Sequence, residues 1–268
     1  MITLLTDFGT RDIYVGVMKG AIAQINPALQ VVDLTHEIPP QDLFAARFNL
    51  MSAFPYFPSG TIHVAVVDPG VGGARRAIAL QLQTAFLVGP DNGIFSGILE
   101  QHPAIAAVEL TNPSYWRTSS PSSTFHGRDI FAPVGAHLAS GVPLSALGRA
   151  IAPDSLVSLP LYPCEPTAAG IMGTVQYIDQ FGNLITNIPA SLVSDSCQGD
   201  KVAHSWCIQL ATTTIPAATT YAAVPQGAPL ALIGSHGWVE IAINGGNAQQ
   251  KLGLCVGDRL KLHLSPLK

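Results

Sequence analysis

The spacing of apolar residues changes near Leu161, and this change constrains the fold more than any other feature of the sequence. Before it, short apolar runs alternate with segments of helical period; after it come short β-rich segments separated by turn residues. Strands separated by helices favour a largely parallel sheet, whereas short strands joined by turns favour an antiparallel sandwich or barrel. The sequence therefore predicts an α/β domain with a mostly parallel sheet over residues 1–161 and an all-β, barrel-like domain over residues 162–268.

Apolar or β-branched runs mark the expected strands, which span residues 2–6, 30–34, 61–67, 77–82 and 85–88 in the first domain. In the second domain they span residues 170–178, 184–188, 205–210, 229–233, 238–243 and 259–264. Helical periods cover residues 41–54, 93–101 and 132–138. A further helix is expected to begin near Asp12 as its cap, with an apolar face of Ile13, Val17, Ala21 and Ile25.

The composition argues against several classes of protein. Apolar residues make up 48% of the chain and charged residues 11%, so a large core can form and disorder is not expected. A net charge of −4 without a basic stripe argues against nucleic-acid binding. No secretory signal opens the sequence, and prolines interrupt the long uncharged stretch at residues 202–239, so no membrane span is expected. Since the four cysteines show neither CxxC spacing nor a disulfide framework, a reduced cytoplasmic protein is predicted.

Two aspartates directly follow predicted strands of the first domain, Asp7 and Asp68. Ligands of open α/β sheets collect beyond the carboxyl ends of the strands, where a carboxylate can hold a ribose diol or pair with arginine. Capping or turn formation explains each aspartate equally well. Asp68 also opens a Gly- and Pro-rich loop that Arg75 closes, so the two side chains could converge on one small group. A structural turn with a surface salt bridge is the alternative.

A third polar segment, residues 124–131, leads into the expected helix at residues 132–138. His126 would lie at the start of this helix, where backbone N–H groups favour anions, although a structural role explains a single histidine as well. Asp129 is expected to be the N-cap and Arg128 to pair within the fold. The other histidines lack metal-ligand spacing, so no metal site is predicted.

Two segments of the second domain stand out, and the first has the chemistry to bind a purine. Phe181 and Asn183 combine an aromatic ring with a side-chain amide. Residues 235–248 form a polar turn, a strand and a Gly/Asn turn. An ordinary turn at Gly182 and a β-hairpin with Trp238 in the core are the structural alternatives.

Taken together and in this order, the motifs resemble those of the S-adenosyl-L-methionine (SAM) hydroxide adenosyltransferases, the family related to the bacterial fluorinase and chlorinase. The resemblance rests on residues 5–9, 33–36, 68–76, 89–93, 124–129, 181–188 and 235–248. It implies an α/β domain followed by a barrel-like domain, and a homotrimer whose sites lie between neighbouring subunits. It implies no cofactor, because SAM itself is the substrate.

The resemblance also implies roles for single residues. Asp68, Arg75 and His126 match the trio that forms the attacking hydroxide. The positions that would bind the substrate are Asp7 for the ribose; Phe181, Asn183, Ile243 and Gly245 for the adenine; Asp179 and Ser235 for the methionine; and Glu240 on the strand beside them.

Departures from the halogenating relatives bear on the nucleophile. Those relatives carry a tyrosine at the position of Asp68 and a Tyr-Ser pair at the positions of His126 and Gly127. An aspartate would repel a halide, whereas Asp, Arg and His can orient a water. His236 and Gln41 stand where halogenases carry arginine and tryptophan, so the contacts implied there are less defined.

The predicted activity is hydrolysis of SAM to adenosine and L-methionine, by attack of water or hydroxide at C5′ of the ribose. Methionine leaves as a neutral thioether without a general acid, so the trio has only to position and activate the water. An aspartate paired with arginine is a weak base, which favours His126 as the proton acceptor, but the sequence leaves both open. A SAM-dependent halogenase and a non-catalytic sensor of SAM or adenosine are the alternative functions.

Overall fold

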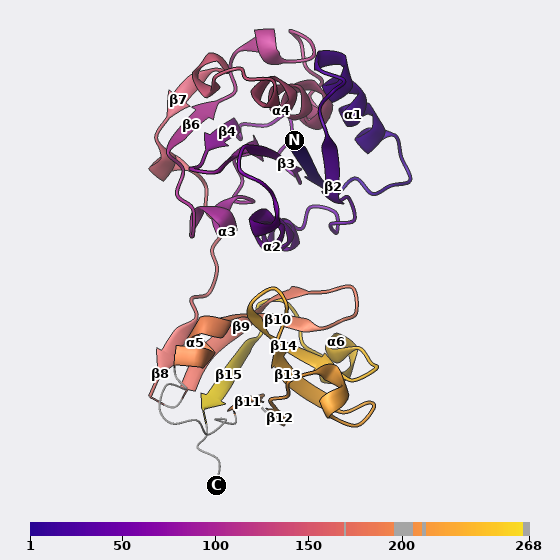
Figure 1. Ribbon diagram of the computed structural model, residues 1–268, viewed down its shortest axis with the longest axis vertical. Helices are drawn as coiled ribbons and strands as arrows, with labels where there is room; N and C mark the ends of the chain where they lie inside the picture. The colour runs from indigo at the N-terminus through magenta and orange to yellow at the C-terminus, as the bar shows by residue number, and fades with distance from the viewer. Residues whose placement is uncertain (169, 196–205, 211–212, 265–268) are drawn as a thin grey trace. The chain divides into compact units, whose positions relative to one another are not determined.

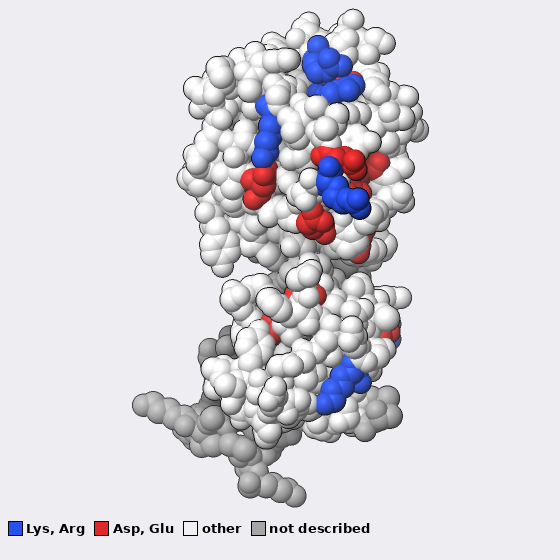
Figure 2. Space-filling model, turned by 90° about the vertical axis from the view of Figure 1, so that its right-hand side faces the viewer, with Lys and Arg blue, Asp and Glu red and all other residues white. Residues whose placement is uncertain are grey.

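The computed structural model describes residues 1–168, 170–195, 206–210 and 213–264. The chain divides into two compact units, unit 1 (Met1–Leu159) and unit 2 (Pro160–Lys268), each with its own sheet and core. Charged side chains are sparse on the face in Figure 2, where they form small groups rather than a basic stripe. No helix among the described residues is long and apolar enough to cross a membrane.

The sheet of unit 1 has the strand order β2-β1-β3-β5-β4-β6-β7 (Figure 1). The strands are β1 (Ile2–Thr6), β2 (Val31–Thr35), β3 (Thr61–Val66), β4 (Ala77–Gln81), β5 (Ala85–Pro90), β6 (Ala106–Glu109) and β7 (Arg149–Ile151). Strands β2, β1, β3 and β5 pair in parallel. Strand β6 points the same way, because it is antiparallel to β4 and β4 is antiparallel to β5. The predicted mostly parallel sheet is confirmed.

Helices cover both faces of this sheet. In Figure 1, α1 (Tyr14–Ile25) and α4 (Ala132–Ala139) lie on one face, and α2 (Leu43–Ala53) and the short α3 (Ser96–Leu99) on the other. All six residues of β3 are consequently buried, as a parallel strand between two helical layers requires. The core includes Phe131 and Leu4, both with no exposed surface.

The predicted face of α1 is only partly correct, since Ala21 is buried and Ile25 packs against the core. Met18, Ala21 and Ile22 are its buried residues, whereas Ile13 is 75% exposed. A strict i, i+4 row drifts by about 40° per step at 3.6 residues per turn, so a buried stripe must mix steps of three and four. Asp12 does not cap the helix either: the N-cap is Ile13, without a side-chain hydrogen bond.

Two other predicted helices are shorter than expected, and the backbone explains both starts. Gly93 has φ +92° and Gln41 has φ +67°, conformations that an α-helix does not contain. Helix α3 therefore begins at Ser96. Helix α2 begins at Leu43, with Asp42 as the N-cap that accepts a hydrogen bond from the Ala45 N–H.

Unit 2 is an antiparallel sheet in the order β12-β11-β15-β9-β10-β14-β13, with β8 beside β9. The strands are β8 (Glu165–Thr167), β9 (Gly170–Ile178), β10 (Leu184–Pro189), β11 (Trp206–Gln209), β12 (Thr214–Pro216), β13 (Pro229–Ile233), β14 (Trp238–Ile243) and β15 (Arg259–Leu264). The chain after β12 reaches β13, where the Ala218 N–H donates to the carbonyl of Ala231 over 2.8 Å. The predicted barrel-like domain is confirmed.

Two short helices, α5 (Ala190–Asp195) and α6 (Ala248–Leu252), complete unit 2. The barrel interior is built from β-branched and leucine side chains such as Val175, Leu184 and Ile241. The first residue of the strand predicted over 205–210, Ser205, lies outside the described residues. The described part of this strand is β11. Trp238 is half-buried rather than a core residue.

Candidate active site

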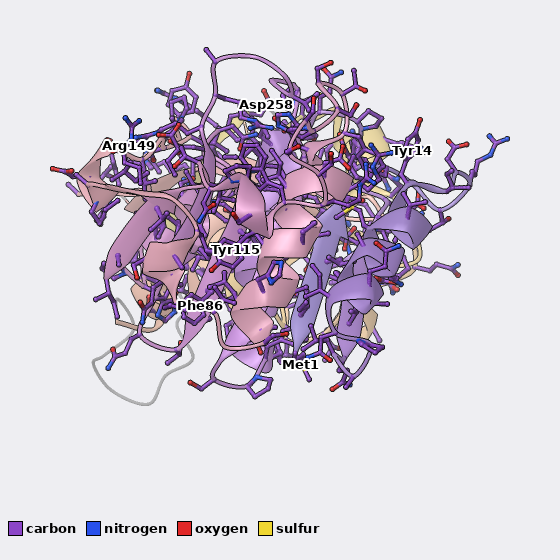
Figure 3. All side chains as sticks on the ribbon, turned by 90° about the horizontal axis from the view of Figure 1, so that it is seen from above. Met1, Tyr14, Phe86, Tyr115, Arg149 and Asp258 are labelled. Atoms are coloured by element: carbon purple, nitrogen blue, oxygen red, sulfur yellow. The ribbon has the colours of Figure 1, made fainter. Side chains whose placement is uncertain are left out.

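The carboxyl ends of β1 and β3 lie at the same edge of the unit 1 sheet, because the two strands pair in parallel and in register. In Figure 3, Met1 and Phe86, near the starts of β1 and β5, lie toward one side of the molecule, and Tyr14 lies toward the other. A cavity of about 390 Å³ opens at the carboxyl ends. It is lined by Asp7, Phe8, Tyr14, Pro40, Gln41, Val66, Asp68, Pro69, Val71, Thr124, Phe125, His126 and Gly127.

Asp68, Arg75 and His126 form one hydrogen-bonded group beside this cavity. The Arg75 Nε donates to both carboxylate oxygens of Asp68, at 2.9 and 3.1 Å, and its Nη2 donates to Asp68 Oδ2 as well. The same Nη2 lies 2.7 Å from Nδ1 of His126. The side chains of Asp68 and Arg75 are 5% and 11% exposed, so this pair is no surface salt bridge.

The contact with Arg75 determines the tautomer of His126. A guanidinium group has donors only, so Nδ1 must accept the hydrogen bond with its lone pair. The neutral ring then carries its hydrogen on Nε2. Burial lowers the pKa of His126, and the positive charge of Arg75 lowers it further, against the opposing charges of Asp68 and Asp129. In this geometry His126 is a neutral hydrogen-bond donor.

The loop between Asp68 and Arg75 comes close to the segment before His126 at one glycine. Gly72 has φ +74°, and a Cβ there would overlap the carbonyl oxygen of Ser123. Glycine is required on both counts, since a side chain would strain the backbone and push the two segments apart. The approach brings the Asp68–Arg75 loop within reach of His126.

His126 directly precedes a π-helical turn, Gly127–Phe131, in which the N–H of Ala132 donates to the carbonyl of Gly127 five residues earlier. The predicted N-cap role of Asp129 is wrong, because the helix continues from this turn into α4 without a side-chain cap. Asp129 is instead a buried anion that accepts from the Ser122 N–H at 2.8 Å and from two arginines, Arg117 and Arg128. Although burial raises its pKa, the arginine hydrogen bonds outweigh this and hold the pKa well below its usual range.

Asp7 lies in the same cavity, directly after β1. Its Oδ2 accepts a hydrogen bond of 2.8 Å from the backbone N–H of Gln41. Among the described residues, Gln41 alone combines a side chain with a positive φ, and such strain is common at ligand-binding sites. One oxygen of Asp7 is thereby oriented by the backbone of Gln41.

In unit 2, Asp179 organises the turn that joins β9 to β10. Its Oδ1 accepts from the N–H groups of Phe181 and Asn183 at 2.9 and 2.8 Å, and its Oδ2 accepts from Asn183 Nδ2 at 2.9 Å. Gly182 has φ +80°, and a Cβ there would overlap the side chain of Asn247. The turn therefore presents Phe181 and Asn183 in one fixed orientation.

These two residues line a pocket of about 460 Å³ together with Tyr221, Ile243, Gly245 and Gly246. Phe181 is 74% exposed and Tyr221 is 45% exposed, so both rings offer apolar surface to a flat ligand. Tyr221 is not among the predicted residues, because it lies in a short 3₁₀ turn outside every recognised motif. An isolated aromatic residue among Ala, Thr and Pro was the available signal.

The remaining residues predicted to bind substrate do not line this pocket. Glu240 is 3% exposed; the Tyr221 hydroxyl donates to its Oε1 over 2.7 Å, and His236 Nε2 lies 3.2 Å from its Oε2. Burial and the hydrogen bond to Glu240 raise the pKa of Tyr221 to about 12. Ser235 is exposed in the turn after β13. Within the described part of the chain, no cluster of His, Cys, Asp and Glu could hold a metal ion.

Comparison with known proteins identifies the family. Residues 2–148 match the SAM hydroxide adenosyltransferase N-terminal domain, and residues 173–261 match the C-terminal domain of the same family. A protein of Salinispora arenicola named (R)-S-adenosyl-L-methionine hydrolase is 40% identical over 265 residues, which cover 97% of each chain.

The chain belongs to the SAM hydroxide adenosyltransferase family.

A solved structure and a more distant relative are also similar to this SAM hydroxide adenosyltransferase. The crystal structure of an uncharacterized conserved protein from Thermotoga maritima superposes with a TM-score of 0.89 at 36% identity, over 98% of this chain and all of that one. The fluorinase of Actinoplanes sp. is more distant, at 28% identity over 271 residues and 91% of each chain. The predicted kinship with both hydrolases and fluorinases is therefore confirmed.

Proposed function

We propose that this protein hydrolyses SAM to adenosine and L-methionine. The observation that carries the proposal is the buried group of Asp68, Arg75 and His126, which borders a cavity that also contains Asp7. The relatives at about 40% identity are named SAM hydrolases, and the fluorinases are more distant. The carboxylate of Asp68 would repel a halide ion and can accept a proton from water.

In the proposed step, the oxygen of one water forms a bond to C5′ of the ribose as the bond from C5′ to the sulfonium sulfur breaks. The electron pair of that bond stays with sulfur, so methionine leaves as a neutral thioether. Asp68 accepts the proton of the water, because Nδ1 of His126 is engaged by Arg75 and Nε2 already carries hydrogen. The Nε2–H of His126 and the guanidinium of Arg75 orient the water oxygen and stabilise its developing negative charge.

We further propose that Asp7 holds the ribose hydroxyls and that unit 2 holds the rest of SAM. The rings of Phe181 and Tyr221 suit the two faces of adenine, and the amide of Asn183 suits its amino edge. Glu240 holds the Tyr221 ring at the pocket through its hydroxyl. Asp179 supports this pocket by fixing the turn, and with Ser235 it would hold the methionine end.

Chromatography of the products after incubation with SAM tests the proposed function. Adenosine and methionine in equal amounts are expected. Methylthioadenosine or S-adenosylhomocysteine in place of adenosine would overturn the proposal. A 5′-halo-adenosine formed in chloride or fluoride would show a halogenase, and binding of SAM without any product over hours would show a sensor.

The pH dependence of kcat should report the protonation of His126. The imidazole must be neutral, since an imidazolium Nδ1–H would point at the Arg75 guanidinium. Because burial and Arg75 lower its pKa, the acid limb of kcat should have its midpoint below about pH 6.5, the ordinary value for histidine. His126→Asn keeps an acceptor for Arg75 but does not titrate there, so it should lose this acid limb. An acid limb centred above that value, or one that survives in the variant, would contradict the assignment.

We propose that the active protein is a homotrimer, in which unit 1 of one subunit and unit 2 of its neighbour bind the same SAM molecule. The family resemblance and the complementary chemistry of the two pockets support this arrangement. Co-expression of Asp68→Ala and Asn183→Ala chains tests it. If each site draws one residue from each of two subunits, random mixing should restore about a quarter of the wild-type sites. Activity no higher than that of the separate variants, or a molecular mass other than that of a trimer, would contradict it.

We also propose that the protein acts in the cytoplasm on a small molecule rather than on nucleic acid or a membrane. The three described cysteines, Cys164, Cys207 and Cys255, are unpaired thiols, as is usual in a reducing compartment. Fractionation of cells that express the protein tests the location, and recovery in the membrane or secreted fraction would contradict it.

A further inference from the structure

The turn after β5 contributes no side chain to the unit 1 cavity. It nevertheless contacts both ends of the loop that runs from Asp68 to Arg75. The Nδ2 of Asn92 donates to the carbonyl of Val67 over 2.9 Å, and Val67 directly precedes Asp68. The Oδ1 of Asn92 accepts from the Ile94 N–H at 3.3 Å and closes the turn itself. Asn92 thus joins the turn to the residue from which Asp68 projects.

Asp91 contacts the other end of the loop. Its side chain is 3% exposed, and its Oδ2 accepts a hydrogen bond of 2.8 Å from Nε of Arg76, the residue directly after Arg75. The backbone N–H of Asp91 donates to the carbonyl of Arg76 over 3.0 Å. The Oδ1 of Asp91 accepts from the Val157 N–H at 2.9 Å, so both carboxylate oxygens are engaged.

We infer that Asp91 and Asn92 are positioning residues for hydrolysis: they set the separation of Asp68 and Arg75 and hold Arg75 against His126. The inference rests on the proposed function and deepens it. Residues 69–74 contain three glycines and a proline, so their own backbone favours no single conformation strongly, and contacts from outside the loop help to fix its ends. Two adjacent side chains in the turn that directly follows β5 supply such contacts.

Strand pairing alone does not require these contacts. Strand β5 is already held by its ladders to β3 and β4, which end at Val64 and at the pair Ala77–Pro90. The contacts of Asn92 and Asp91 lie beyond those ladders, at Val67 and Arg76. Their effect is therefore on the loop rather than on the register of the sheet.

Kinetics of the Asn92→Ala variant test the inference. Loss of the contact to Val67 should lower kcat about tenfold, because small misplacements of reacting groups are costly, while KM for SAM stays unchanged. The charged groups around His126 are Arg75, Asp68 and Asp129, and only the first two belong to the loop. A loosened Arg75 should depress the pKa of His126 less, so the acid limb of kcat should move to higher pH.

Controls separate positioning from general stability. Glu100→Gln removes the negative charge that pairs with buried Arg47 in the same unit, and it should leave kcat unchanged at temperatures well below unfolding. Asn92→Asp has the same shape without the donor, and it serves if the alanine variant does not fold. Wild-type kcat and an unmoved acid limb in a folded Asn92 variant would overturn the inference alone. A wild-type enzyme that releases no adenosine would instead overturn the proposed function.

Discussion

Replacing Asp68 with alanine should lower adenosine release by about a thousandfold, the scale of removing a general base and misplacing its charged neighbour. The variant loses the proton acceptor, and the buried guanidinium of Arg75 loses the carboxylate that fixes its Nε and Nη2. Binding of adenosine should change little, since the Phe181–Asn183 turn is untouched. Chromatography of adenosine and calorimetry of adenosine binding measure the two effects.

Asp68→Asn is the matched variant that tests whether Asp68 accepts the proton of the attacking water. The amide has the same shape and its oxygen can still accept from Arg75, but it cannot take a proton at neutral pH. A loss as large as that of alanine supports Asp68 as the acceptor. Full activity of the asparagine variant would transfer that role to another group, and full activity of the alanine variant would remove the trio from the mechanism.

Gly72→Ala should lower kcat about a hundredfold, because it separates groups that must act together within a fraction of an ångström. The new Cβ would overlap the carbonyl oxygen of Ser123, so the loop must move away from the segment that carries His126. KM for SAM should change less than kcat, since the adenine pocket lies in unit 2. Steady-state kinetics and thermal unfolding of the variant measure the two effects.

Gly60→Ala provides the comparison that isolates the clash. Gly60 has φ +87°, close to that of Gly72, but a Cβ there would meet no atom within 4 Å. Both variants should therefore lose about 1 kcal/mol of stability through the left-handed backbone. Only Gly72→Ala should lose activity, and equal kcat values for the two would show that the contact with Ser123 has no role in the reaction.

Much of the fold follows from the pattern of apolar residues, because burial between two layers demands continuous runs such as β3 and burial on one face of a barrel demands alternation. The pattern is weaker where an element is short. Strands β6 and β7 escaped prediction because four and three residues are too few to show a period. The face of α1 was predicted only in part, because a plain i, i+4 row drifts around a helix and carries Ile13 out of the buried stripe.

The residues of the candidate site were likewise predictable only in part. Residues within motifs were found: Asp68, Arg75 and His126 meet as expected, although 51 positions separate Arg75 from His126. Roles that depend on tertiary contacts were not found. Asp129 carries the ordinary sequence signature of an N-cap, yet two arginines and a π-helical turn give it a different task. Tyr221 has no local signature, because its place at the pocket depends on the tertiary contact with Glu240 rather than on its neighbours in sequence.

The π-helical turn at Gly127–Phe131 makes the site sensitive to chain length in a way that substitutions do not reveal. Such a turn is an α-helix with one residue too many. Deleting one residue from it would restore the regular helix and rotate His126 by about 100° around the axis, away from Arg75. A single lost codon in this turn would therefore abolish the alignment while leaving Asp68, Arg75 and His126 all in the chain.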